Sequence, residues 1–189
     1  QKLCETKNAP TDITVTDGKI VVDYLPIGTY ELKEIQAPDG YLLNETVYTI
    51  TVNKDQTTTQ TVVNEEPTGS IDLTKEINSD LTDGNIGDAY LKGNEYTLKA
   101  KEKITNKAGT VTYFEKDAVV DTQVTDEQGK LKFDDLHVGK YYIEESKSNE
   151  TLVLNPDDID VSIDYEGQTV SKILRSTSTD NRVNMQKIQ

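Results

Sequence analysis

The amino-acid sequence predicts an all-β protein built from two tandem β-sandwiches. Thr, Val, Ile and Tyr recur in short alternating runs, which is the pattern of strands with one buried face and one solvent-facing side. Turns rich in Gly and Asp separate these runs at regular intervals, and no stretch shows a helical period. An internal repeat divides the 189 residues into two copies, so we expect two sandwiches rather than one.

The strands are predicted, in chain order, where apolar residues alternate with polar ones. Each run is bounded by a turn such as Asp17-Gly18 or Gln128-Gly129. The clearest predicted strands cover residues 30–34, 48–52, 70–77, 96–101, 141–145 and 159–165.

The repeat is clearest in two ten-residue stretches, 25–34 and 136–145. Their sequences are LPIGTYELKE and LHVGKYYIEE, and an offset of 111 carries Glu34 to Glu145. The boundary between the copies falls near residues 65–69, where Pro and Gly interrupt two strands.

These observations predict a first domain over residues 1–66 and a second over 67–189. The second has its core in 69–183 and runs into the start of a next repeat. Only 33 residues precede Glu34, whereas Lys75 already lies 70 residues before Glu145. We therefore expect the first domain to lack its N-terminal strand or strands.

Each predicted strand of the repeat places a polar side chain on an apolar face. Side chains alternate across a strand, so Glu34 shares a face with Tyr30 and Leu32. By the same alternation Lys75 shares a face with Ile71, Leu73 and Ile77, and Glu145 with Tyr141 and Ile143. Asn64 follows Val62 at the expected close of the first domain, and aligning the two boundaries makes Asn181 its counterpart, with Asn184 the alternative.

An inward lysine, glutamate and asparagine are best explained together, because an isolated buried charge costs several kcal/mol. Burial favours the neutral amine and the neutral acid. Such an amine could attack the asparagine carboxamide while the glutamate moves protons, which would release ammonia and form an isopeptide bond. Correct positioning is worth an effective molarity of about 10^5 to 10^8 M. The alternatives are an ordinary buried ion pair between Lys75 and Glu145, and a Lys75 whose amine reaches solvent at a strand edge.

The stretch LPIGTYELKEIQAPDGY, residues 25–41, resembles the E-box and following loop of Cna B-type, or SpaA-like, prealbumin-fold domains. These domains occur in adhesins and pilus subunits of Gram-positive bacteria. Residues 73–75 and 62–65 match the lysine and asparagine strands of the family. The resemblance implies immunoglobulin-like sandwiches of about seven strands, and a Lys75–Asn181 bond catalysed by Glu145.

Two departures from the family pattern limit what the resemblance implies. The second copy has SKSN at 146–149 where the family has the APxGY loop. The first copy keeps Glu34 and its acceptor Asn64 but has no partner lysine, unless Lys2 takes that role. We therefore expect no bond in residues 1–66.

The resemblance implies structural stalk or shaft modules of an extracellular protein, with the cell-wall anchor outside these residues. The expected partners are neighbouring repeats of the same protein. The alternative is direct binding to a host extracellular matrix or cell-surface protein, for which residues 101–124 offer the one large insertion. An enzyme is not expected, because Glu34 and Glu145 lie in different domains and cannot flank one scissile bond.

The composition excludes several other functions. A net charge of −14 disfavours nucleic acid and direct membrane contact, which need clusters of Lys and Arg. One cysteine, Cys4, and one histidine, His137, allow neither an internal disulfide nor a multi-histidine metal site. The acidic stretches 80–85 and 155–158 lack the spacing of an EF-hand loop, so no metal or cofactor is predicted.

Overall fold

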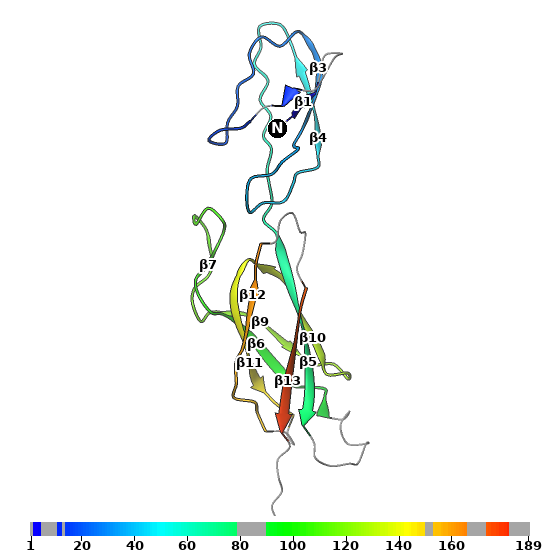
Figure 1. The fold of residues 1–189 in the computed structure, drawn as a ribbon, viewed down its shortest axis with the longest axis vertical. Coiled ribbons are helices and arrows are strands. Elements are labelled where there is room, and N and C mark those ends of the chain that lie inside the picture. The colour runs from blue at the N-terminus through cyan, green and yellow to red at the C-terminus, as the bar shows by residue number, and fades with distance from the viewer. Residues whose placement is uncertain are drawn as a thin grey trace, which may run out of the picture. The chain divides into compact units, whose positions relative to one another are not determined.

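The computed structural model describes residues 2–4, 11, 12, 14–78, 90–149, 153–165 and 173–181. The chain forms two compact units, Gln1–Glu66 and Pro67–Gln189, called unit 1 and unit 2 below. Their regular structure consists of strands, which confirms the all-β prediction (Figure 1). No helix in the described part of the chain is long and apolar enough to cross a membrane.

Unit 2 is a sandwich of a three-stranded and a four-stranded sheet. The three-stranded sheet has the order β10 (Lys130–His137), β5 (Thr68–Asn78), β13 (Ile173–Asn181). The four-stranded sheet has the order β12 (Ile159–Ile163), β11 (Gly139–Lys147), β6 (Glu95–Ala100), β9 (Val119–Val124). Together they give the seven strands that the family resemblance implied.

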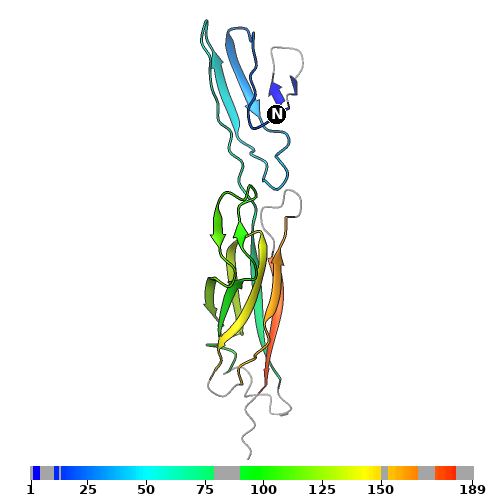
Figure 2. The same cartoon turned by 90° about the vertical axis from the view of Figure 1, so that its left-hand side faces the viewer.

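The strands β5 and β13 lie side by side and run parallel, whereas the other pairs in unit 2 are antiparallel (Figures 1 and 2). Parallel neighbours cannot be joined by a tight hairpin, so a long connection must separate them. Here all the other described strands of unit 2 lie between them in the sequence. The first and last described strands of unit 2 are therefore hydrogen-bonded neighbours.

The core of unit 2 lies between its two sheets. Because side chains alternate along each strand, one apolar row from each sheet faces inward. The fully buried members include Ile71, Leu73 and Phe133 from one sheet and Tyr96, Leu98, Tyr141 and Ile143 from the other. Closing off this core removes the large apolar side chains from water, which is the main favourable term in folding.

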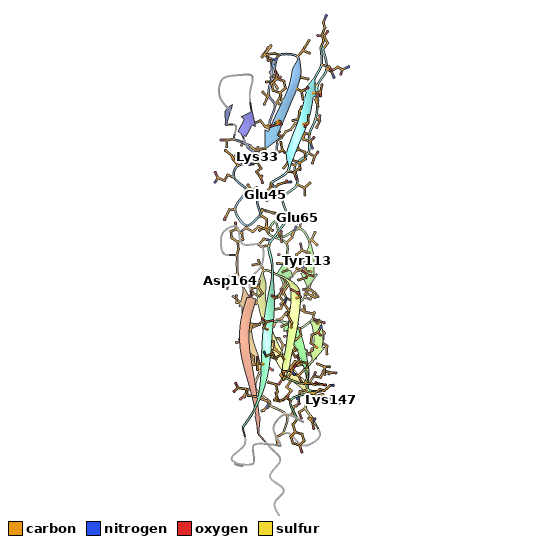
Figure 3. The ribbon with its side chains drawn as sticks, turned by 90° about the vertical axis from the view of Figure 1, so that its right-hand side faces the viewer. Lys33, Glu45, Glu65, Tyr113, Lys147 and Asp164 are labelled. Carbon is orange, nitrogen blue, oxygen red and sulfur yellow. The ribbon has the colours of Figure 1, made fainter. Side chains whose placement is uncertain are left out.

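The segment 101–124, the one large insertion that could bind a host protein, belongs partly to the sandwich itself. Its last six residues form β9 within the four-stranded sheet, and a small hairpin of β7 (Ile104–Thr105) and β8 (Thr112–Phe114) precedes them. Tyr113 of this hairpin stacks on His137, with ring centroids 3.5 Å apart. Figure 3 shows Tyr113 at the opposite end of unit 2 from Lys147, the last residue of β11.

Unit 1 contains one four-stranded sheet, in the order β2 (Thr11–Asp12), β1 (Lys2–Cys4), β3 (Gly28–Lys33), β4 (Val47–Val52). Its register repeats that of unit 2: Gly28 pairs with Val52 as Gly139 pairs with Ile163, at an offset of 111 for both residues. The sheet thus corresponds to the four-stranded sheet of unit 2.

The described residues of unit 1 contain no counterpart of the β10-β5-β13 sheet. The prediction of a strand closing at Asn64 was wrong, because residues 53–66 form no ladder. Their side chains still alternate between half-buried and exposed from Thr61 to Glu66. A strand is defined by hydrogen bonds to a neighbour, and the described residues of unit 1 contain no strand that pairs with this segment.

The turn before β10 is packed against the backbone of Lys75. Gly129 has a φ of +73°, and a Cβ added to it would lie 2.9 Å from the carbonyl oxygen of Lys75. We expect Gly129→Ala to lower the free energy of unfolding of unit 2 by about 2–3 kcal/mol, because alanine is strained at this φ and its Cβ would also clash with the Lys75 carbonyl oxygen. Gly109 has a similar φ but open space around it, so Gly109→Ala should cost only about 1 kcal/mol. Urea denaturation of both variants checks this, and equal losses would contradict it.

Candidate functional site

The candidate site of unit 2 begins with a lysine in the middle of the three-stranded sheet. Strand β5 lies between β10 and β13, and its inward side chains pack against the four-stranded sheet, which shields them from water. Lys75 is only 1% exposed, and its backbone N–H donates to the carbonyl of Gly129 at 2.7 Å. The alternation with Ile71 and Leu73 places it inside, as predicted.

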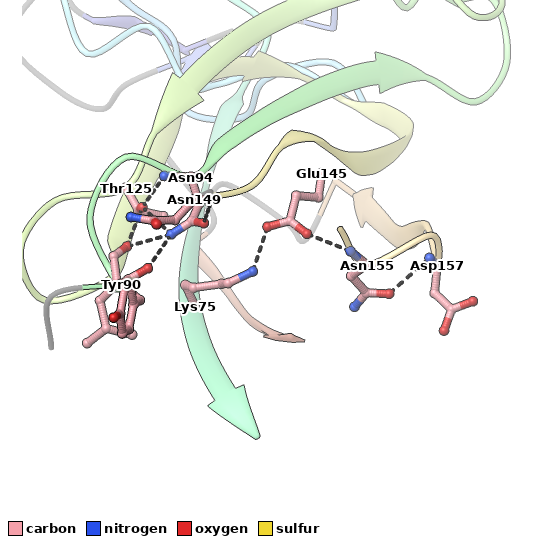
Figure 4. Close-up of polar contacts among 9 residues, drawn as sticks. Lys75, Tyr90, Asn94, Thr125, Glu145, Asn149, Asn155 and Asp157 are labelled. Carbon is pink, nitrogen blue, oxygen red and sulfur yellow. Dashed lines mark hydrogen bonds and ion pairs between the residues drawn. The ribbon is translucent and has the colours of Figure 1, made fainter. Parts of the chain in front are cut away.

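Glu145 meets this lysine from the opposite sheet. It lies near the end of β11, where a register shift between Glu145 and Lys147 interrupts the pairing with β6. Its Oε1 accepts a hydrogen bond from Lys75 Nζ at 2.5 Å, and its Oε2 accepts one from the backbone N–H of Asn155 at 2.7 Å (Figure 4). The Lys75 amine also lies 5.7 Å from the ring centroid of Tyr96.

The pair joins the two sheets through the core. Glu145 is only 6% exposed, so both partners have lost most of their hydration. Burying such charges costs several kcal/mol each, and close pairing with further hydrogen bonds is what offsets that cost. The described geometry supplies both, because one carboxylate oxygen holds the amine and the other is held by a backbone N–H.

The predicted acceptor Asn181 lies on β13, next to β5. The backbone register pairs Ser178 with Lys75 and Asn181 with Asn78, so Asn181 lies three residues further along the strand. The side chain of Asn181 lies outside the described residues, as does all of Asn184. The structure thus brings Lys75 and Glu145 together, and it places Asn181 on the neighbouring strand.

Unit 1 contains a buried glutamate that is held in the same way as Glu145. Glu34 is 5% exposed, and its Oε2 accepts from the backbone N–H of Asn44 at 2.7 Å, as Glu145 does from Asn155 at the same offset of 111. The Asn64 side-chain amide donates to the same oxygen at 2.6 Å and to the carbonyl of Leu42 at 3.0 Å. Lys2, the one alternative amine considered for unit 1, lies on β1, which corresponds to β6 rather than to β5.

Two features of the site were not predicted from the sequence: the backbone donors that anchor both glutamates, and a tyrosine contact that repeats with them. Tyr30 donates to the carbonyl of Pro26 at 2.7 Å, and Tyr141 donates to that of His137 at 2.6 Å. Burial raises the pKa of the Tyr141 hydroxyl, which keeps it protonated as a donor. The repeated Tyr four residues after each turn was the available sequence clue.

A second buried polar group holds the loop that departs from the family pattern. Asn94 is fully buried; its side-chain amide donates to the carbonyls of Tyr90 and Leu91, both at 2.9 Å. Its Oδ1 accepts from the backbone N–H of Asn149 at 2.8 Å, and Thr125 donates to the Leu91 carbonyl at 2.5 Å (Figure 4). Asn94 therefore ties the loop after β11 to the start of β6.

The outer face of the same strand is solvated. Glu144 pairs with Lys99 at 2.5 Å on that face, and both side chains remain partly exposed. The pKa of Lys99 is raised, first of all by the hydrogen bond that its ammonium group donates to the Glu144 carboxylate. Within the described residues, no three His, Cys, Asp or Glu side chains gather closely enough to hold a metal ion.

Comparison with known families accounts for the presence, in both units, of a strand that carries a buried glutamate. The sequence profile of the SpaA prealbumin-like fold domain matches residues 2–66 and 82–177 of this chain. The chain belongs to the SpaA prealbumin-like domain family. The two matched ranges correspond to unit 1 and to most of unit 2, which confirms the resemblance seen in the E-box stretches.

Among solved structures, the SpaA-like chain is similar to the Bacillus anthracis TIE protein. The two share 30% sequence identity with a TM-score of 0.66, over 96% of this chain and 30% of that one. It also matches GBS52, the minor pilin of Streptococcus agalactiae, at 17% identity and a TM-score of 0.43, over 89% of this chain and 66% of that one. This chain therefore spans less than a third of the TIE chain and about two thirds of GBS52. Comparison with curated proteins gives no match.

Removing the buried carboxylate should cost far more than removing its exposed neighbour. Glu145→Ala takes away the group that Lys75 contacts at 2.5 Å, and breaking a buried ion pair by deleting one partner costs about 3–5 kcal/mol. Glu144→Ala, one residue away on the solvated face, should cost less than about 1 kcal/mol. Urea denaturation measures the free energy of unfolding of both variants. Similar decreases would show that the buried pair contributes no more to stability than the exposed one.

Proposed function

We propose that the chain forms structural modules in the stalk or shaft of a Gram-positive cell-surface protein. Its partners are then neighbouring repeats of the same protein, and unit 2 acts by resisting extension. The observation that carries this proposal is the buried Lys75–Glu145 contact, which ties the two sheets through the core. Membership of the SpaA prealbumin-like family and the likeness to the TIE protein support it.

The strand arrangement of unit 2 suits a load-bearing role. The start of β5 and the end of β13 are the points at which a pulling force would act on the sandwich. Because the two strands are parallel neighbours, such a force slides them along each other and loads their nine paired positions at once. A ladder that must break together resists more force than one that opens pair by pair.

We further propose that Lys75 becomes joined to Asn181 by an isopeptide bond, with Glu145 as the catalytic residue. Nζ attacks Cγ of the carboxamide, the Nζ–Cγ bond forms and the Cγ–Nδ2 bond breaks. Ammonia leaves with protons that Glu145 relays from the amine, for which its contact at 2.5 Å is suited. In the described register, Ser178 is the residue of β13 that lies opposite Lys75. The bond therefore requires Asn181 to lie three residues closer to Lys75 along the strand than it does in this register.

The bond can be measured by the intact mass of the denatured chain. We expect a mass lower than the sequence predicts by one ammonia, and a cross-linked peptide containing Lys75 and Asn181. Lys75→Ala and Glu145→Ala should both restore the full mass. A full mass in the folded wild-type chain would remove the covalent proposal while leaving the ion pair, and a cross-link to Asn184 would correct the acceptor.

Single-molecule pulling tests the load-bearing role itself. If β5 and β13 are joined, unit 2 should show no unfolding step, because the residues between Lys75 and Asn181 are shielded from the force. Lys75→Ala should then unfold in one step with the contour length of the whole unit. Low-force, stepwise opening of the wild-type unit would contradict a role in resisting extension.

A further inference from the structure

The carboxylate of Glu145 is held by a backbone N–H that belongs to no strand. Asn155, the donor of that N–H, lies before β12 in the stretch 153–158, which forms no ladder. The two residues before it, Val153 and Leu154, are 48% and 43% exposed, so apolar packing holds this stretch only loosely. Something other than strand pairing or packing must therefore fix the direction of the Asn155 N–H.

The side chain of Asn155 closes a turn that does this. Its Oδ1 accepts a hydrogen bond from the backbone N–H of Asp157 at 3.0 Å (Figure 4). An asparagine that binds the N–H two residues further on mimics a backbone turn and orients the peptides around it. The register of β11 with β12 would, if it continued, place Asp157 opposite Glu145. The turn thus takes the N–H that the ladder would have used, and the N–H of Asn155 meets the carboxylate instead.

Unit 1 contains the same turn at the same place. The Oδ1 of Asn44 accepts from the N–H of Thr46 at 3.0 Å, while the N–H of Asn44 binds Oε2 of Glu34 at 2.7 Å. The register of β3 with β4, continued, would likewise place Thr46 opposite Glu34. The two residues after the asparagine differ, since they are Glu and Thr at 45–46 but Pro and Asp at 156–157. The asparagine, rather than the fixed φ of a proline, is therefore what the two turns share.

We propose that Asn155 is the positioning residue of Glu145. Its side chain sets the direction of its own backbone N–H, and that N–H holds Oε2 so that Oε1 stays directed at Nζ of Lys75. Asn44 has the same role toward Glu34. This positioning exists whether or not the isopeptide bond forms, whereas its effect on the rate of that bond rests on the proposed function.

Amide hydrogen exchange in the full chain tests the positioning without the bond. The background is Asn181→Ala with Asn184→Ala, which removes both candidate acceptors. There the amide at position 155 should exchange slowly, because it is bound to a carboxylate. Adding Asn155→Ala should speed exchange at that position by about 10-fold or more, while the amides of β11 keep their protection. Adding Asn155→Asp, which keeps an Oδ1 acceptor, should restore most of the protection.

A matched control removes a similar turn elsewhere in unit 2. The Oδ1 of Asn106 accepts from the N–H groups of Thr110 and Val111 in the β7–β8 hairpin. Asn106→Ala should therefore leave exchange at position 155 unchanged. Unchanged exchange there in Asn155→Ala, or equal acceleration in Asn155→Asp or in Asn106→Ala, would overturn the positioning role.

A milder variant keeps the test decisive if Asn155→Ala does not fold. Serine closes such turns more weakly than asparagine, so Asn155→Ser should give a smaller acceleration at the same amide. No acceleration in that variant would overturn the positioning role.

The rate of bond formation gives a second measurement, in the chain that keeps Asn181 and Asn184. Intact mass is followed over time after cell-free synthesis. Asn155→Ala should slow the loss of ammonia by about 100-fold, because the catalytic carboxylate is no longer held in place, and Asn155→Asp should restore the rate. A wild-type chain that never loses ammonia would overturn the isopeptide bond and leave the exchange result standing. An unchanged rate in Asn155→Ala would overturn the positioning role.

Discussion

The contact between Lys75 and Glu145 is the constraint on which the architecture of unit 2 depends. It joins the middle strand of one sheet to an inner strand of the other across the hydrophobic core. An amine and a carboxylate cannot stay in such a place unless each meets the other at hydrogen-bond distance. The requirement therefore fixes how the two sheets lie on each other more narrowly than apolar packing, which tolerates small shifts.

The two units share a device for holding the carboxylate. In each, a backbone N–H ten residues after the glutamate binds Oε2, and a tyrosine four residues before the glutamate donates to a carbonyl of the preceding turn. The backbone N–H holds the carboxylate, and the tyrosine holds the strand that carries it. What differs between the units is the neighbour of the other oxygen, because β5 supplies a lysine to unit 2 and no described strand does so in unit 1.

The two units also differ in the segments that correspond to the β10-β5-β13 sheet. In unit 2, β10 and β13 gain regular structure by pairing with β5 on its two edges. In unit 1 the corresponding chain runs without a ladder, and its apolar side chains stay in water although Tyr30 and Leu32 of the sheet are buried. Within the described residues, the segments beside β5 are strands in unit 2, whereas their counterparts in unit 1 are not. Local sequence preference alone does not suffice.

The sequence by itself determined the all-β class, the two repeats and the inward faces that carry Glu34, Lys75 and Glu145. These follow from alternation along a single strand, which is a local property. Only the tertiary structure decided which segments pair, so it showed that residues 53–66 form no strand and that Ser178, not Asn181, lies opposite Lys75. Register between distant strands depends on the lengths of the intervening loops and on which neighbours are present. Neither the loop lengths nor the identity of the neighbouring strands can be read from the sequence of the strand itself.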